Sequence, residues 1–201
     1  MPPAGREPLS VGILALQGGF EAHARILHRL GAIPREVRVA ADLQGLDALI
    51  IPGGESTVMS LGIEREGLAE PLRQRARAGM PMLGTCAGMI MLDRDHLGIL
   101  DLDARRNAFG RQLRSFEGEI ELDGIDGGPL RGVFIRAPWV EEHGEGVEVL
   151  GEVDGHPVAV RQDNIVAVAF HPELAGETRL HTLLLELARA DSPRPPARKP
   201  A

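Results

Sequence analysis

The chain has 201 residues, of which 43% are hydrophobic and 3% aromatic. This length and aliphatic bias suit one domain with a buried core and are typical of a parallel sheet covered by helices. The formal net charge of −7 argues against nucleic acid as a partner, because nucleic-acid binders usually carry a basic face.

Three further features bear on where the protein works. A single cysteine cannot form an internal disulfide and fits a reducing compartment. No apolar run approaches the roughly 18 residues of a membrane-spanning helix, and residues 1–7 lack the apolar core of a signal peptide. We therefore expect a cytoplasmic protein with no membrane partner.

Both ends of the sequence differ in composition from the rest. Residues 1–8 are polar and contain prolines, and residues 191–201 are basic and proline-rich. Such segments bury too little apolar surface to join a core. We expect one domain over residues 9–190, with flexible tails over 1–8 and 191–201.

Strands and helices alternate through the first half of the chain. Short apolar runs bounded by glycine or proline predict strands, and apolar residues at helical spacing predict helices. The predicted strands are Val11–Leu16, Ile33–Val39, Ala48–Ile51 and Met80–Leu83, and the predicted helices are Phe20–Leu30 and Leu68–Ala78. This alternation implies βαβ units and a mostly parallel sheet.

The second half is less regular. From Ile120 to Val160, short apolar runs are separated by Gly and Asp, a pattern that favours antiparallel hairpins. Ile165–Phe170 predicts another strand, and Leu180–Ala190 predicts a closing helix. The expected fold is α/β: an open three-layer domain whose mostly parallel, mixed sheet carries helices on both faces.

The segment Gly84-Thr85-Cys86-Ala87-Gly88 places a nucleophile between small residues after a predicted strand. This is the pattern of a nucleophile elbow, a sharp turn from a strand into a helix. The turn would put Cys86 at the C-terminal edge of the sheet and aim the N–H of Ala87 at a developing oxyanion. Alternatively, Cys86 is a small buried hydrophobe, as most free cysteines are.

The segment Phe170-His171-Pro172-Glu173 offers a base for the cysteine and a group to orient that base. Pro172 favours extended backbone at His171, and residues two apart on an extended chain share a side. The carboxylate of Glu173 is therefore expected to hold the imidazole of His171. Alone, the segment suits a solvated loop; with Cys86 it predicts a Cys-His-Glu triad.

A glycine pair follows the predicted strand Ala48–Ile51. Gly53 and Gly54 let backbone amides approach a ligand closely, and the N–H of Gly54 is expected to complete an oxyanion hole with Ala87. Alternatively, the segment is a plain turn with Ser56 or Thr57 as a helix N-cap. The Gly-Lys-Ser/Thr ending of a phosphate-binding loop is missing.

Two arginine-bearing segments are candidates for contacting a substrate carboxylate. Guanidinium groups bind carboxylates through paired hydrogen bonds, which the basic stretch Arg105–Gln112 could supply. Ile135-Arg136 could line a pocket or simply end a strand. The stretch Arg105–Gln112 also suits a solvated loop.

The other six histidines, among them His23, His96, His143 and His156, lack such a frame and are expected at the surface. They are scattered without the spacing of metal ligands. The sequence therefore implies neither a metal nor any other cofactor.

The elbow, the Pro-Gly-Gly-Glu-Ser loop and the late His-Pro-Glu resemble those of class I, triad-type glutamine amidotransferases, which have a flavodoxin-like fold. The likeness narrows to the glutaminase subunits of pyridoxal 5'-phosphate synthase and runs from about Val11 to about Ala188. Four segments carry it: Leu16-Gln17-Gly18, Gly53-Gly54-Glu55-Ser56-Thr57, Arg106-Asn107-Ala108-Phe109-Gly110-Arg111-Gln112 and Gly132-Val133-Phe134-Ile135-Arg136-Ala137-Pro138.

This resemblance implies hydrolysis of L-glutamine to glutamate and ammonia. Cys86 would form a glutamyl thioester, with His171 and Glu173 as relay. The residues that would contact glutamine are Gly54, Glu55, Ser56, Arg106, Ile135 and Arg136. The ammonia would pass to the pyridoxal 5'-phosphate synthase subunit in a hetero-oligomer, in which a dodecameric core carries the glutaminase subunits and docking activates them.

Three alternative functions are weighed against this one. Another amidotransferase subunit, feeding imidazole-glycerol-phosphate, carbamoyl-phosphate or GMP synthesis, would share the triad, but the Arg106–Gln112 and Phe134–Pro138 motifs argue against it. A peptidase or other hydrolase on the same elbow would turn over its substrate unaided. A non-catalytic binding subunit would have no reason to retain an intact triad.

Overall fold

The computed structural model describes residues 7–17, 19–109 and 115–191. Within these ranges the main sheet has seven strands. They are β1 (Ser10–Leu14), β2 (Ile33–Val37), β3 (Ala48–Ile51), β4 (Met82–Thr85), β9 (Glu148–Val153), β10 (His156–Gln162) and β11 (Ile165–Val168). The order across the sheet is β2-β1-β3-β4-β11-β10-β9.

Five of these strands are parallel and two are not. Strands β2, β1, β3, β4 and β11 run parallel, in the 2-1-3-4-5 order of flavodoxin-like folds. The hairpin β9–β10 pairs antiparallel with β11 at one edge. The predicted mostly parallel, mixed sheet is confirmed.

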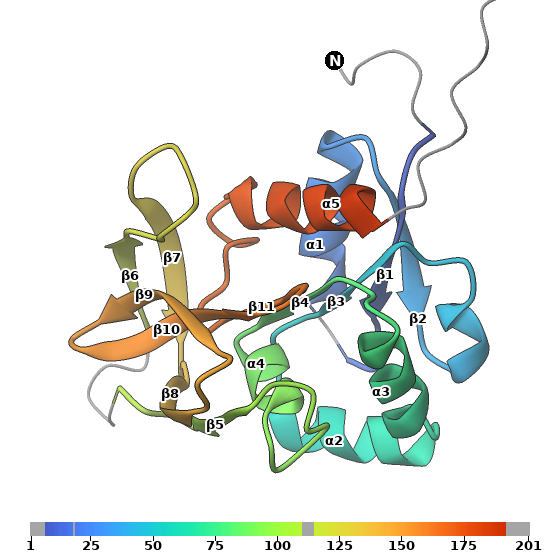
Figure 1. Ribbon diagram of the computed structural model, residues 1–201, viewed down its shortest axis with the longest axis horizontal. Coiled ribbons are helices and arrows are strands. Elements are labelled where there is room, and N and C mark those ends of the chain that lie inside the picture. The colour runs from blue at the N-terminus through green and yellow to red at the C-terminus, as the bar shows by residue number, and fades with distance from the viewer. Residues whose placement is uncertain (1–6, 18, 110–114, 192–201) are drawn as a thin grey trace, which may run out of the picture.

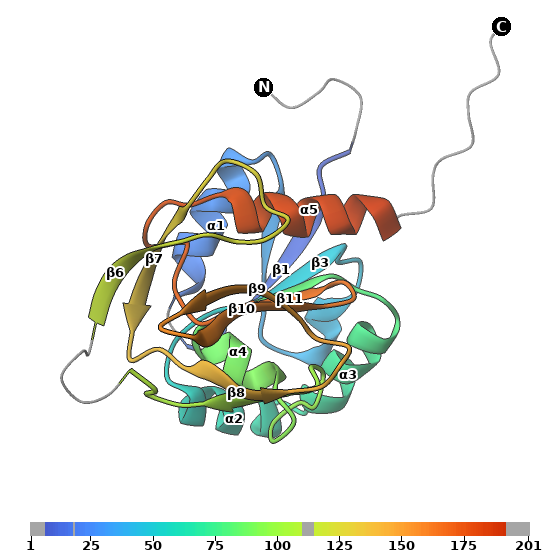
Figure 2. The same cartoon turned by 60° about the vertical axis from the view of Figure 1, so that its left-hand side comes forward.

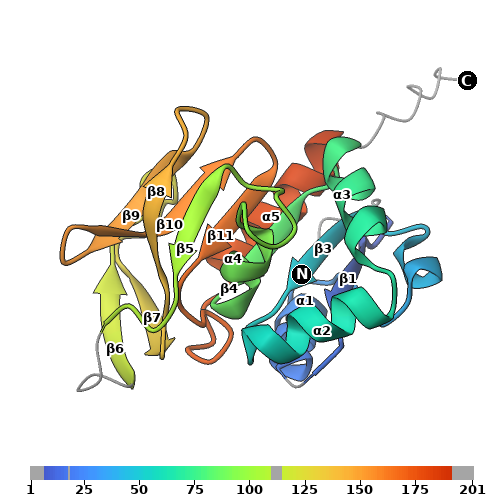
Figure 3. The same cartoon turned by 90° about the horizontal axis from the view of Figure 1, so that it is seen from below.

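Helices cover both faces of the sheet (Figures 1 and 2). Helices α1 (Phe20–Arg29) and α5 (Arg179–Asp191) lie on one face. Helices α2 (Ser56–Arg65), α3 (Ala69–Arg77) and α4 (Ala87–Leu92) lie on the other, which Figure 3 brings forward. A short 3-10 helix, Ala40–Leu43, follows β2. The three predicted layers are therefore present.

Two small antiparallel sheets lie beside the β9–β10 edge (Figure 1). One pairs β6 (Ser115–Ile120) with β7 (Leu130–Ile135), as predicted for a hairpin. The other pairs β5 (Leu102–Arg105) with β8 (Trp139–His143). This second pairing joins segments far apart in the sequence, and no local pattern predicted it.

The core is aliphatic, as the composition indicated. Every residue of β3, β4 and β11 is buried, because helices shield both faces of the parallel strands. Aromatic rings pack together beside the β6–β7 hairpin, where the ring of Phe134 stacks on Phe116 at 4.4 Å and tilts against Phe170 at 5.4 Å between centroids. This cluster joins the β6–β7 hairpin to the chain after β11.

Predicted elements differ from the observed ones mainly at their ends. Strand β11 stops at Val168 rather than Phe170, where the chain bends before His171. Helix α5 extends to Asp191, the first residue of the expected C-terminal tail. Residues 1–6 and 192–201 of the expected tails lie outside the described residues.

Helix α2 was expected only in the alternative interpretation of this segment, as a helix capped by Ser56 or Thr57, and neither residue is its N-cap. The N-cap is Glu55, whose carboxylate accepts hydrogen bonds from the backbone N–H groups of Thr57 (3.3 Å) and Val58 (3.0 Å). Short hydroxyl side chains are the usual caps, but the longer carboxylate reaches the same donors and also suits the positive end of the helix dipole.

Candidate active site

The predicted site residues, together with Gln17, which was not predicted, gather at the carboxyl ends of the parallel strands. Gln17 lies shortly after β1, the Gly53-Gly54 loop follows β3, and Cys86 directly follows β4. His171 comes three residues after the end of β11. Open α/β sheets bind ligands at this edge, where neighbouring strands lead their loops in opposite directions.

Cys86 has a strained backbone, with φ 48° and ψ −107°. Such a conformation is uncommon for a residue with a side chain and is held here by its surroundings. The backbone N–H of Cys86 donates to the carbonyl of Val168 at 2.8 Å, and its Sγ lies 3.8 Å from the carbonyl oxygen of Ile135. The turn thus points a thiol toward the end of β7, as a nucleophile elbow requires.

The flanking glycines serve packing rather than the turn itself. A Cβ on Gly88 would lie 2.9 Å from the carbonyl carbon of Ile51 and closer still to its oxygen. One on Gly84 would lie 2.7 Å from the Leu92 side chain and 2.9 Å from the Gly88 backbone. Small residues here let α4 approach β3 and β4 closely, and this approach holds the strained turn.

His171 and Glu173 are in contact, but through a turn over residues 172–176 instead of the extended chain that was predicted. Imidazole Nδ1 lies 2.7 Å from carboxylate Oε1, and the two side chains are 12% and 4% exposed. The backbone N–H of His171 donates to the carbonyl of Val133 on β7 at 2.8 Å, which fixes the base against the hairpin. A turn over residues 172–176 brings the carboxylate back to the ring.

Electrostatics favour a charged pair at this position. Burial works to lower the pKa of His171, but its interactions with Cys86 and Glu173 outweigh burial and raise the pKa to about 10. Burial also works to raise the pKa of Glu173, yet the hydrogen bond from His171 and the charges of nearby histidines lower it overall. At neutral pH the imidazole therefore carries a proton and the carboxylate stays ionised.

A pocket of about 60 Å³ opens beside Cys86. It is lined by Gly54, Glu55, Ser56, Cys86, Ala87, Ile90, Arg106, Asn107, Ile135 and Arg136. All the residues predicted to contact glutamine or the oxyanion thus border one space. That space is smaller than the roughly 300 Å³ or more of typical ligand pockets.

The loop after β3 is held from both sides. The side-chain amide of Gln17 donates to the carbonyl of Glu55 at 2.9 Å, and its oxygen accepts from the N–H of Glu55 at 3.2 Å. The guanidinium of Arg106 donates to the Glu55 carboxylate at 3.3 Å and to the hydroxyl of Thr57 at 3.2 Å. These contacts fix the backbone of Gly54 beside the thiol.

The prediction singled out neither Gln17 nor Asn107. Asn107 lines the pocket with φ 50°, a left-handed conformation that asparagine tolerates better than most residues. Both residues lie inside segments that carry the family resemblance, and this position could have indicated a role in the site. Gly18 and residues 110–112 of those segments lie outside the described residues.

The surface expectation was wrong for two histidines. His23 on α1 and His181 on α5 are both 0% exposed. The spacing of apolar residues in their helices could have predicted this burial. Leu27 follows His23 by four residues and Leu185 follows His181 by four, and both leucines are buried. Each histidine therefore shares the inward face of its helix. Burial lowers the pKa of both imidazoles.

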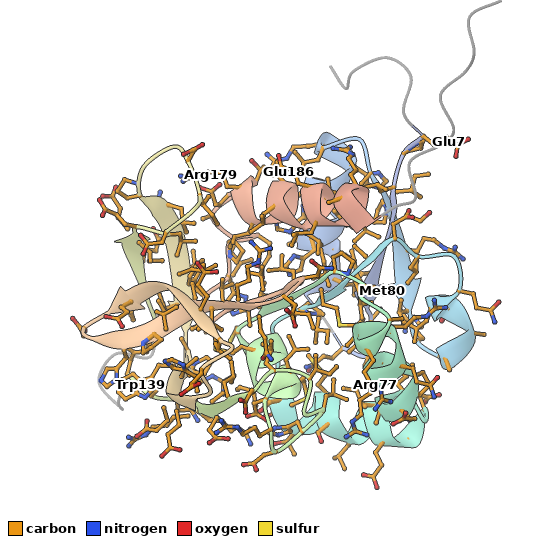
Figure 4. The ribbon with its side chains drawn as sticks, in the orientation of Figure 1. Glu7, Arg77, Met80, Trp139, Arg179 and Glu186 are labelled. Atoms are coloured by element: carbon orange, nitrogen blue, oxygen red, sulfur yellow. The ribbon has the colours of Figure 1, made fainter. Side chains whose placement is uncertain are left out.

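Larger hollows among the described residues lie elsewhere, and two of them have volumes of about 400 Å³. A cavity of about 400 Å³ is lined by residues that include Arg77, Met80 and Asn164, the first two of which are labelled in Figure 4. Met80 precedes β4 and Asn164 precedes β11, so this hollow lies at the amino ends of the strands. It contains none of the predicted site residues, and the smaller pocket at the carboxyl ends is the candidate site.

Over residues 7–17, 19–109 and 115–191, no group of three His, Cys, Asp or Glu side chains is arranged to hold a metal ion. Within the same ranges, no helix has the length and apolar character needed to cross a membrane.

A flavodoxin-like sheet with a cysteine elbow after β4 and a His-Glu pair after β11 defines a protein of the class I glutamine amidotransferase type. The chain belongs to the SNO glutamine amidotransferase family, which it matches over residues 13–189.

Named relatives and a solved structure agree with this assignment. Pyridoxal 5'-phosphate synthase subunit PdxT of Frankia alni is 51% identical over 189 residues, 90% of this chain and 95% of that protein. The subunit of the same name from Acidothermus cellulolyticus is 53% identical over 196 residues, with the same shares covered. A crystal structure of a glutamine amidotransferase, 46% identical, superposes with a TM-score of 0.84 over 89% of this chain and 98% of that one.

Proposed function

We propose that this chain is a glutaminase subunit that hydrolyses L-glutamine and delivers the ammonia to a pyridoxal 5'-phosphate synthase subunit. The observation that carries the proposal is the interaction of Cys86, which lines the pocket, with the imidazole of His171, which is hydrogen-bonded in turn to Glu173. Cys86 is the nucleophile, His171 the acid and base, and Glu173 the group that orients the imidazole.

In the first half of the reaction, Cys86 Sγ attacks the side-chain amide carbon of glutamine and forms a carbon–sulfur bond. The carbonyl oxygen takes up the negative charge, which the N–H groups of Gly54 and Ala87 stabilise; removal of one such donor typically costs roughly 3–4 kcal/mol of barrier. His171, which holds the thiol's proton, gives it to the departing nitrogen. The carbon–nitrogen bond breaks, and ammonia and a thioester result.

In the second half, water replaces ammonia. His171, now neutral, takes a proton from the water while the water oxygen attacks the thioester carbon. The carbon–sulfur bond breaks, glutamate leaves, and the sulfur and imidazole return to their starting protonation. Throughout, Glu173 keeps Nδ1 protonated and the opposite ring nitrogen directed at the reacting atoms.

The remaining pocket residues bind the amino-acid end of glutamine. The Arg106 guanidinium is suited to its α-carboxylate, and the Glu55 carboxylate to its α-ammonium. Gly54, Ser56, Ile135 and Arg136 line the same pocket. In the present conformation Arg106 and Glu55 contact each other, and glutamine would separate them.

A synthase partner is supported by the subunit names of relatives about half identical to this chain. Exposed apolar side chains on α2 support it as well: Val58 is 49% and Leu61 61% exposed, and a spacing of three residues puts them on one side of the helix. We further propose a single domain over residues 9–190, a dodecameric synthase core carrying these subunits, and a cytoplasmic location.

The first experiment measures glutamate release from glutamine by the purified chain, with and without the synthase subunit. Release that is strongly stimulated by the partner is expected. Full activity alone, unchanged by the partner, would instead indicate a stand-alone hydrolase or a different synthase.

Cys86→Ala tests the nucleophile. The variant should lose glutaminase activity by several orders of magnitude, while still binding glutamine and the synthase subunit. Activity of the assembled complex with added ammonium should survive, because that route bypasses the thiol. Robust glutamate release by Cys86→Ala would refute the assignment.

A further inference from the structure

A buried polar cluster lies directly behind the His171–Glu173 pair. It joins His23 of α1, His181 of α5, Thr85 at the end of β4 and the second carboxylate oxygen of Glu173. Both histidines are 0% exposed, Thr85 is equally buried, and the Glu173 side chain is 4% exposed. Polar groups are rarely placed this deep without a role in holding one another.

The contacts form a chain. His23 Nδ1 lies 2.9 Å from His181 Nε2. On its other side, His23 Nε2 lies 3.3 Å from the Thr85 hydroxyl and 3.6 Å from Glu173 Oε2. That carboxylate oxygen has no hydrogen-bond partner within the described part of the chain. At 3.6 Å the His23 nitrogen stands just beyond hydrogen-bonding distance.

The chemistry of these groups selects one tautomer for each histidine. An ionised carboxylate can only accept, so the nitrogen facing it must carry a proton. His23 with its proton on Nε2 accepts at Nδ1 from the Nε2–H of His181. The remaining nitrogen, His181 Nδ1, is then a bare lone pair, in agreement with its lack of a partner among the described residues. The opposite arrangement would aim a lone pair at the carboxylate and bury an unsatisfied N–H.

We propose, on the basis of the proposed function, that His23 is a positioning residue whose Nε2–H holds the second oxygen of Glu173 and so keeps the carboxylate aligned on His171. His181 sets the tautomer of His23. The long resting contact suits this role, because catalytic hydrogen bonds are often long before substrate binds and tighten in the complex. His23 acts through Glu173 and does not touch the substrate.

The same cluster reaches the other side of the site. The Thr85 hydroxyl accepts a hydrogen bond from the backbone N–H of Gly53 at 3.0 Å. The N–H of His23 therefore lies between the group that orients the base and the loop that presents the N–H of Gly54. The buried imidazole of His23 therefore connects Glu173 with the Gly53-Gly54 loop through Thr85.

A spectroscopic test addresses the tautomer directly. In full-length protein labelled with 15N at histidine, His23 is expected to be neutral at pH 7, with its proton on Nε2, and His181 likewise. The groups that face His23 and bear on its titration are His181, Glu173 and His171. A proton on Nδ1 of His23 would overturn the proposal. This measurement needs no catalysis, so it stands even if the proposed function fails.

Kinetics of variants in the assembled complex provide the second test. His23→Leu is expected to lower kcat by about 10- to 100-fold, the effect of one lost hydrogen bond to a buried carboxylate, with KM little changed. The pKa of Glu173 should rise without its donor, so the acid limb of the kcat/KM profile should move to higher pH. His23→Gln, which retains an N–H in a similar place, should restore part of the rate.

His28→Leu is the matched control, because His28 lies on the same helix but is exposed. It should leave kcat and the pH profile unchanged. A purely structural role for His23 predicts a different result: His23→Leu would unfold at a lower temperature but retain the rate and pH profile per folded molecule. That outcome would overturn the positioning role.

Discussion

Gly53→Ala is expected to disable the site without unfolding the protein. A Cβ on Gly53 would lie 2.9 Å from Nδ1 of His171 and closer still to Cε1 of the same ring. Since ordinary Cβ contacts begin at 3.4 Å, the ring must withdraw by about 1 Å, a displacement that can cost on the order of 100-fold in rate. That loss corresponds to about 2.7 kcal/mol of barrier.

The assay is glutamate release by the assembled complex, with Gly146→Ala as control. A Cβ on Gly146 would meet one atom, at 3.8 Å, so the control should keep full rate. Urea unfolding should show that Gly53→Ala remains folded. A Gly53→Ala enzyme with kcat/KM close to that of the native chain would refute the reasoning, because it would mean that the loop yields instead of the imidazole.

Two further predictions concern stability. Gly88→Ala forces a Cβ onto the Ile51 carbonyl, which is backbone and cannot rotate away. The free energy of unfolding, measured by urea titration, should therefore fall by about 3 kcal/mol or more. Gly118→Ala is the control and should change this free energy little, because its added Cβ would have contacts of 3.6 Å or longer. The second prediction concerns the loss of stability at low pH. Burial, together with His23 and Arg29, lowers the pKa of His181 from 6.5 to about 3. The stability gained by keeping His181 neutral is therefore present above pH 6.5 and is lost as the pH falls toward 3. Between pH 8 and pH 5 this single group should cost roughly 2 kcal/mol, and His181→Leu should flatten that dependence; an unchanged slope would contradict it.

The parallel half of the sheet could be predicted from the sequence because its signals are local. Ala48–Ile51 is a continuous apolar run closed by Pro52 and two glycines, and the observed β3 has the same limits. Helix α3 likewise falls within one residue of its prediction at each end. In each case burial on both faces or on one stripe leaves a pattern that the sequence shows directly.

Features set by distant partners could not be predicted in this way. Strand β8 pairs with β5 from more than 30 residues away, and nothing in either segment indicates the other. The burial of His23 depends on His181, which lies 158 positions further along. A polar side chain on an apolar helix face was interpreted as exposed, because the partner that satisfies it was not visible locally.

Within the site, too, short motifs could be predicted from the sequence and contacts between distant residues could not. Cys86 and the His171–Glu173 pair could be singled out because each occupies a short motif. The clamp of Gln17 on Glu55 and the contact of Arg106 with Thr57 join separate motifs, and only their proximity at the sheet edge explains them.

Strand β7 contacts both His171 and Cys86. Its Val133 carbonyl accepts the N–H of His171, and its Ile135 carbonyl faces the thiol of Cys86. The strand belongs to a hairpin outside the main sheet (Figure 1). The hairpin therefore has two points of attachment. A displacement of the hairpin would move the surroundings of the Cys86 thiol and of the His171 imidazole together.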